Sequence, residues 1–197
     1  MGLSIHYSGS FKQEASLERM IEEVKDIAQI YEWKYFIHNI HFPESTFGIE
    51  AYDGQLYGIS LTPPDCETIS LTFLSNGKMC SGFGLKCFGH SDMEKDKQYL
   101  YMLSTKTQFA GSTIHKIIIH LFKYLNKIYF QEFHLSDEGY YWESEDESIL
   151  EEQFKLYTNL INEFESSIKN HPKSKTESFK DYFDRIINIL DTKRNKN

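Results

Sequence analysis

The side chains that could do chemistry gather in one stretch of the chain, residues 132–152, which we call the acidic segment. It carries nine carboxylates and no lysine or arginine, and its middle places three aromatic rings between acids. The candidate binding residues are Asp137, Glu138, Tyr140, Tyr141, Trp142, Glu143 and Glu145. Carboxylates beside aromatic rings could bind a basic partner, hold a hard cation or serve glycoside chemistry. The same residues are also typical of a solvated turn followed by a capped helix, so no catalytic residue is assigned.

The charge distribution favours one class of partner. The chain of 197 residues has a formal charge of -8, and the acidic segment accounts for all of it. Concentrated negative charge repels phosphate backbones and attracts basic surfaces. We therefore expect a basic protein as partner and no nucleic acid. An antitoxin or immunity-type inhibitor is one concrete form of such a non-enzymatic interaction module.

Histidines and cysteines form no recognisable metal-binding or nucleophilic motif. His115 and His120 lie five positions apart in an expected helix, where their side chains diverge by about 140° and cannot share one metal ion. Cys66, Cys80 and Cys87 lack the paired spacing of metal or redox sites and are expected to be free thiols. We therefore expect no metal and no cofactor.

An enzyme with a dispersed site is the alternative hypothesis. Its residues would be drawn from distant parts of the chain, and a hydrolase is the reaction class that the available side chains suit. A deep cleft that holds at least three of these side chains would support it. They are Asp137, Glu138 and Glu143 together with His6, His115 and His134.

Hydrophobic periodicity predicts the elements that must position the acidic segment. Apolar residues at helical spacing predict a surface helix over 17–31, with Ser16 as its N-cap, and a deeply buried helix over 112–129. Asn76-Gly77 predicts a hairpin turn. Alternation and β-branched or aromatic content predict strands over 3–7, 33–40, 56–62, 68–74, 79–88, 99–109 and 133–135.

The acidic segment itself is expected to lead from a strand to a helix. Asp137-Glu138-Gly139 predicts a turn, Tyr140–Glu143 an extended stretch, and Ser144 with Glu147 a capping box that opens a helix to residue 168. A basic linker starts at residue 169 and a last amphipathic helix follows it. We therefore expect one domain over 1–168 and an appendage over 169–197, whose helix could dock on a second copy to form a homodimer.

The order of elements predicts an α+β fold. Consecutive strands without intervening helices are typical of an antiparallel meander sheet, with helices packed mainly on one face and further helices at the C-terminus. The same order is compatible with a saddle-shaped, TBP-like sheet, as an analogy of fold alone. No basic and apolar leader opens the chain and no apolar run is long enough for a bilayer, so a cytoplasmic location without membrane contact is expected.

Three motifs together carry a resemblance. They are Ile5-His6-Tyr7 near the start, Thr107-Gln108-Phe109-Ala110-Gly111, and Asp137-Glu138-Gly139 followed by Tyr141-Trp142-Glu143. In this combination the chain resembles a group of uncharacterised bacterial cytosolic proteins over residues 3–165. The resemblance implies a bacterial, cytosolic setting and brings no known activity and no known catalytic residues.

Overall fold

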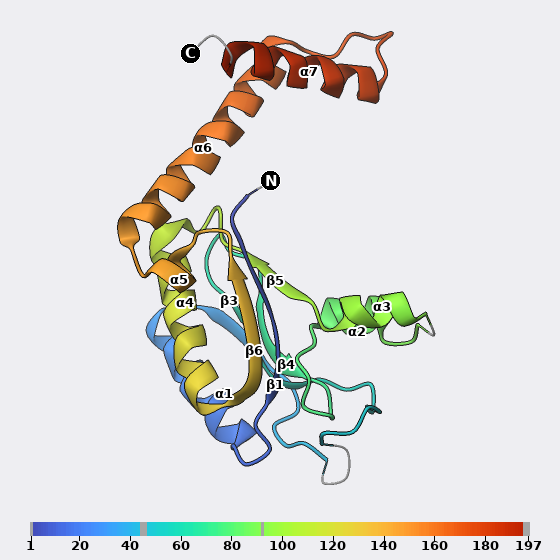
Figure 1. Ribbon diagram of the computed structural model, residues 1–197, viewed down its shortest axis with the longest axis vertical. Coiled ribbons are helices and arrows are strands. Elements are labelled where there is room, and N and C mark those ends of the chain that lie inside the picture. Colours follow the sequence, from blue (N-terminus) through green and yellow to red (C-terminus); the bar gives the residue numbers. More distant parts are fainter. Residues whose placement is uncertain (1, 44–46, 92, 195–197) are drawn as a thin grey trace.

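The strands fall into two antiparallel sheets that share a common helical cover. The computed structural model describes residues 2–43, 47–91 and 93–194. Figure 1 shows a body of strands with helices on either side, from which a helical arm projects. The α+β class and the C-terminal helices predicted from the sequence are confirmed. The antiparallel strands are divided between two three-stranded sheets rather than joined in one meander.

The first sheet has its N-terminal strand in the middle. The strand order is β5-β1-β6, and Ile5 and Tyr7 of the central strand face the core while His6 and Ser8 face outward. The central strand does not end at residue 7 as predicted, because Gly9 allows close approach to the neighbouring strand. A Cβ at Gly9 would lie 2.2 Å from the Glu132 carbonyl oxygen. The strands are β1 (Ser4–Phe11), β5 (Leu103–Lys106) and β6 (Phe130–Asp137).

The second sheet is a simple meander in the order β2-β3-β4. Gly58 in its central strand has φ +117°, and its missing Cβ lets the strand lie against the Leu71 carbonyl. The predicted turn at Asn76-Gly77 is present, since Gly77 N–H donates to the Leu74 carbonyl over 2.9 Å. The strands are β2 (Lys34–Ile37), β3 (Tyr57–Thr62) and β4 (Ile69–Phe73).

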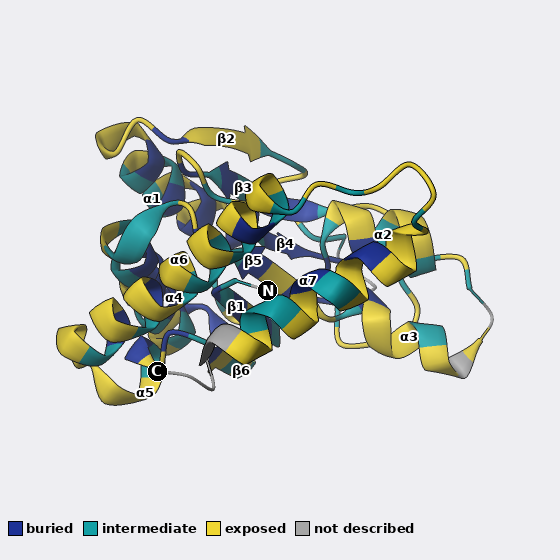
Figure 2. Cartoon of the chain, turned by 90° about the horizontal axis from the view of Figure 1, so that it is seen from above, coloured by how far each residue is buried: buried dark blue, intermediate teal, exposed yellow. Residues whose placement is uncertain are grey.

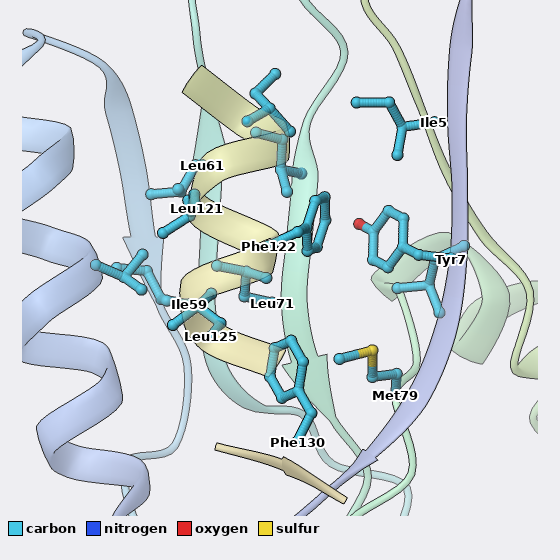
Figure 3. Packing of buried hydrophobic residues seen from close by; sticks show 14 of the residues in the cluster. Ile5, Tyr7, Ile59, Leu61, Leu71, Met79, Leu121, Phe122, Leu125 and Phe130 are labelled. Carbon is cyan, nitrogen blue, oxygen red and sulfur yellow. The ribbon is translucent and has the colours of Figure 1, made fainter. Parts of the chain in front are cut away.

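Two long amphipathic helices cover one side of the strands. They are α1 (Leu17–Ile30) and α4 (Gly111–Ile128). Ser16 caps α1 as predicted, accepting the Arg19 N–H. Figure 3 shows Leu121, Phe122 and Leu125 of α4 packed among apolar side chains of both sheets, so one core holds the body together.

Two predicted strands are wrong in part, because short helices replace them. Residue 79 makes one bridge to Phe73, and the chain then forms α2 (Gly82–Phe88), whose N-cap Ser81 accepts the Gly84 N–H. The strand predicted over 99–109 begins only after α3 (Glu94–Leu100). Aromatic and β-branched content favours strands here, but the Ser81 cap and the packing of α2 on α3 stabilise helices instead.

A helical arm extends from the body. Its first helix is α6 (Glu147–Asn170), which leaves the body and carries α7 (Phe179–Arg194) across its far end (Figure 1). Phe164 and Phe183 stack with ring centroids 6.5 Å apart. Figure 2 shows that much of the arm's surface is exposed. No helix in the described part of the chain is both long and apolar enough to cross a membrane.

Candidate functional site

Asp137, the first predicted site residue, is buried at the end of β6. Its two carboxylate oxygens accept the backbone N–H groups of Gly139, Tyr141 and Trp142 over 2.7, 2.8 and 3.0 Å. Burial acts to raise the pKa of Asp137, but His115 and the backbone N–H groups of Gly139 and Trp142 outweigh it and lower that pKa. Asp137 therefore fixes the turn from inside and cannot itself contact a partner.

A buried histidine joins this turn to the first sheet. Nε2 of His115, on α4, lies 3.0 Å from Oδ1 of Asp137, in an electrostatic contact outside good hydrogen-bond geometry. Nδ1 of the same ring lies 2.8 Å from the Thr107 hydroxyl, which in turn is 3.3 Å from the Leu3 carbonyl. All three side chains are buried. The arrangement resembles a nucleophile, base and acid in residue types, but it lies inside the core and positions elements.

Glu138 faces the N-terminal strand. Its Oε2 accepts the Ser4 N–H over 2.7 Å, and its Oε1 lies 3.8 Å from Nε2 of His6. Nearby, Gln108 accepts the Leu3 N–H through its side-chain oxygen over 3.0 Å. The three motifs that are far apart in the sequence therefore meet at one end of the first sheet, where side chains tie the backbone of β1 in place.

The stretch predicted to be extended is instead a single helical turn, α5 (Tyr141–Ser144). The three N–H bonds to Asp137 organise this turn, and Tyr140 enters it in the left-handed region at φ 58°. The predicted capping box is also wrong, because Asp146 caps α6 by accepting the Ser148 N–H over 2.8 Å. Ser144 instead donates its hydroxyl to the Tyr140 carbonyl.

The aromatic residues of the segment divide between interior and surface. Tyr141 is buried, stacks on His120 with centroids 5.7 Å apart and has its hydroxyl 3.2 Å from Nε2 of that ring. Trp142 is half-buried against Phe133. Tyr140 is 56% exposed. Tyr140 is therefore the aromatic residue of the predicted set that is most available to a partner.

Lysines of α4 neutralise part of the acidic segment. Lys123 pairs with Glu145 and lies over the Trp142 ring, with Nζ 5.5 Å from the ring centroid. The bond from Lys123 lowers the pKa of Glu145. Lys116 pairs with Glu147 over 2.7 Å. Glu143 is exposed like Glu145, so the predicted surface keeps a net negative charge that is smaller than the sequence alone indicates.

An apolar hollow, which we call the helix groove, lies beside this surface between α1, α4 and α5. Its volume is about 480 Å³. Leu121 and Ile117 form part of its wall, Tyr141 and His120 part of its α5 side, and Glu147 stands at its edge. The hollow is thus lined mainly by aromatic and aliphatic side chains, with Thr113 and Lys116 also in its wall, and it is bordered by the start of α6.

Sequence reasoning missed the two exposed aromatic residues of the helix groove. Tyr31, at the end of α1, and Tyr124, on α4, line it and are 47% and 41% exposed. The Tyr124 hydroxyl donates to Glu23 over 2.9 Å, so a second carboxylate stands on the α1 side. Neither tyrosine stands out within its own helix, and only the packing of α1 on α4 makes them neighbours.

The residues of the dispersed-enzyme hypothesis meet in two pairs, His115 with Asp137 and His6 with Glu138, rather than in one cleft. His115 and Asp137 are buried together, whereas His6 and His134 line a shallow hollow of about 360 Å³ on the outer face of the first sheet. Of four cavities in the described part of the chain, none is lined by three of the six side chains named for that hypothesis. Within the same residues, no group of three or more histidine, cysteine or carboxylate side chains could hold a metal ion.

Comparisons with known proteins place the chain in no family. No protein-family model matches it, and no curated protein or solved structure is significantly similar to it.

Proposed function

We propose that this chain is a non-enzymatic, cytoplasmic interaction module that binds a basic amphipathic helix of a partner protein, as an antitoxin or immunity-type inhibitor would. The helix groove is the observation that carries the proposal. It combines an apolar floor with the Lys116–Glu147 ion pair in its lining, and Glu23, which pairs with Arg19, accepts the hydroxyl of the lining Tyr124. A helix that lays its apolar face into such a groove, with lysine or arginine at its margins, matches both features.

The apolar part of the groove supplies anchors for binding. Tyrosine is enriched among the residues that dominate interface energies, because it buries a large rigid surface and keeps a polar tip. Tyr31 and Tyr124 are partly exposed, and the buried side chain of Leu121 supports the wall behind them. A partner helix can therefore bury apolar area here without a large rearrangement of the core.

The charged part supplies direction and speed of association. Lys116 and Lys123 pair with two carboxylates of the acidic segment. Both glutamates are exposed, and ion pairs at the protein surface contribute little to stability. A basic partner can thus exchange with these lysines, while Glu143 remains exposed for a new pair. Attraction of this kind mainly raises the association rate and weakens as salt screens it.

Affinity capture with matched variants tests the proposal. The tagged protein is used to recover partners from an extract of its source cells at low and high salt, followed by mass spectrometry. We expect a stoichiometric basic protein that is lost with Tyr124→Ala, lost with the pair Glu143→Lys and Glu145→Lys, and weakened at high salt. The matched control carries Asp184→Lys and Asp191→Lys on exposed positions of α7.

The comparison between variants decides the outcome. Retention of the same partner by both the Tyr124→Ala variant and the variant with Glu143→Lys and Glu145→Lys would contradict the proposal. Loss of the partner to the same extent from the α7 control would also contradict it. Circular dichroism of each variant must match that of the wild type, so that loss of binding is separated from loss of fold.

A further inference from the structure

A second cavity lies where the two sheets meet, on the side of the strands away from α1 and α4. We call it the junction cavity. Outward-facing residues of β3, β4 and β5 form one wall and residues of α2 and α3 form the other. Figure 1 shows α2 and α3 on the side of the strands opposite α1 and α4. Its volume is about 710 Å³, within the roughly 300–1,000 Å³ range of small-molecule sites. Such sites occur preferentially where separate structural units join.

The strand wall of the junction cavity offers hydrogen-bonding groups. Nε2 of His38 lies 3.1 Å from the Ser60 hydroxyl, and Ser60 is the cross-strand neighbour of Ser70. Ser104 of β5 continues this wall across the junction between the sheets. Hydroxyls both donate and accept, and a neutral imidazole does each at one nitrogen, so the wall can match mixed donors and acceptors on a ligand edge.

The helical wall offers aromatic rings. Phe88 of α2 and Tyr99 of α3 lie with ring centroids 5.5 Å apart and planes inclined by 35°. Tyr99 is 52% exposed and Phe83, on the same wall, is 73% exposed. Aromatic rings left open beside a cavity can stack on a planar ligand, and such stacking is sequence-tolerant for nucleic-acid bases.

The charge of the junction cavity selects against anions. Among the described residues that line it, Glu67 is the one that carries a formal charge, and its Oε2 accepts the Lys106 N–H over 3.0 Å. Burial lowers the pKa of His38, which keeps this ring neutral near pH 7. A phosphate group would therefore find a carboxylate at the cavity and no lining lysine or arginine within the described chain.

We propose that the junction cavity binds a neutral planar heterocycle of the nucleobase or nucleoside type. The ring lies against Phe88 and Tyr99, and the polar edge of the ring meets the hydroxyls of the strand wall. This site is separate from the helix groove, since α1 and α4 lie on the other side of the strands (Figure 1). The inference stands or falls independently of the proposed partner.

Titration calorimetry of the full chain with adenosine, guanosine, cytidine and uridine tests this inference. We expect at least one nucleoside to bind, and its 5′-monophosphate to bind more weakly. Tyr99→Ala should weaken binding about tenfold, as loss of one stacking contact predicts, whereas Tyr99→Phe should retain it. Phe109→Ala, at an exposed ring outside the cavity, is the matched control.

Several results would overturn the inference. One is the absence of heat with all four nucleosides at millimolar concentration. Another is nucleoside binding whose affinity changes by the same amount, or not at all, in Tyr99→Ala and Phe109→Ala. A third is binding of ribose or N-acetylglucosamine alone at the strength of a nucleoside, which would assign the cavity to a sugar. Tighter binding of the monophosphate than of the nucleoside would contradict the charge argument.

Discussion

His115 and Asp137 meet in the interior, with Nε2 of the ring 3.0 Å from Oδ1 of the carboxylate and neither side chain exposed. This contact connects α4 to the end of β6, and the same carboxylate holds the first turn of the segment that follows. The geometry of the acidic surface therefore depends on a residue that a partner never touches.

Replacing this buried carboxylate should destabilise the fold. We expect Asp137→Asn to lower the free energy of unfolding by about 3 kcal/mol, since it removes the charge that faces His115 in the interior and weakens the bonds from three backbone N–H groups. Urea denaturation followed by circular dichroism measures the change. Glu143→Gln, at an exposed position of the same segment, is the control and should change the midpoint little. Equal urea midpoints for Asp137→Asn and Glu143→Gln would show that the contacts of Asp137 do not stabilise the fold.

The same residue predicts a dependence of stability on pH. The pKa of Asp137 is lower in the folded protein than its ordinary value of 3.8. A lowered carboxylate pKa contributes stability above the unfolded pKa, and that contribution is lost as the pH falls through the folded pKa. The stability difference between wild type and Asp137→Asn should therefore be constant near neutral pH and narrow below pH 3.8. A difference that widens in acid would contradict this assignment.

Gly9 should be intolerant of any side chain. A Cβ there would lie 2.2 Å from the Glu132 carbonyl oxygen, so Gly9→Ala must separate β1 from β6. We expect a loss of about 2 kcal/mol in the free energy of unfolding, as for other overpacked sites. Gly82→Ala is the comparison, because its nearest contact would be an ordinary 3.7 Å to Leu56. Thermal denaturation of the two variants side by side measures the effect.

The three thiols should differ in reactivity. Burial raises the pKa of Cys66 and of Cys80 to about 12, whereas Cys87 is exposed. Because the thiolate is the reactive form, iodoacetamide at mildly alkaline pH should modify Cys87 first in the native protein. The two others should react only after denaturation. Peptide mass spectrometry identifies the modified residue, and early modification of Cys80 would contradict its place in the core.

The arm predicts self-association. Phe179 and Ile187 on α7 are 73% and 50% exposed, and burying such side chains against a second copy would be favourable. We expect the full chain to elute as a dimer in size-exclusion chromatography with light scattering. The pair Phe179→Ser and Ile187→Ser, or a chain that ends at Ile168, should be monomeric. An unchanged oligomeric state in both would exclude a dimer through α7.

The local pattern of apolar residues was sufficient to predict the helices and strands with strong periodicity. The helical spacing of apolar residues in α1 and α4 and the β-branched content of β3 and β4 report which face each element buries, because burial of that face largely stabilises it. The α+β class follows from their order. The acidity of residues 132–152 and the Asn76-Gly77 turn are likewise properties of adjacent residues, and both could be predicted.

Only the tertiary structure decided what those residues do. Asp137 and Tyr141 look like surface residues in an acidic segment, yet both are buried, Asp137 against His115 and Tyr141 with its ring stacked on His120. The short helices α2, α3 and α5 lack a long periodic pattern, so caps and packing against distant segments determine them. The helix groove and the junction cavity exist only between elements that are far apart in the chain, and nothing in one element encodes the chemistry of its neighbour.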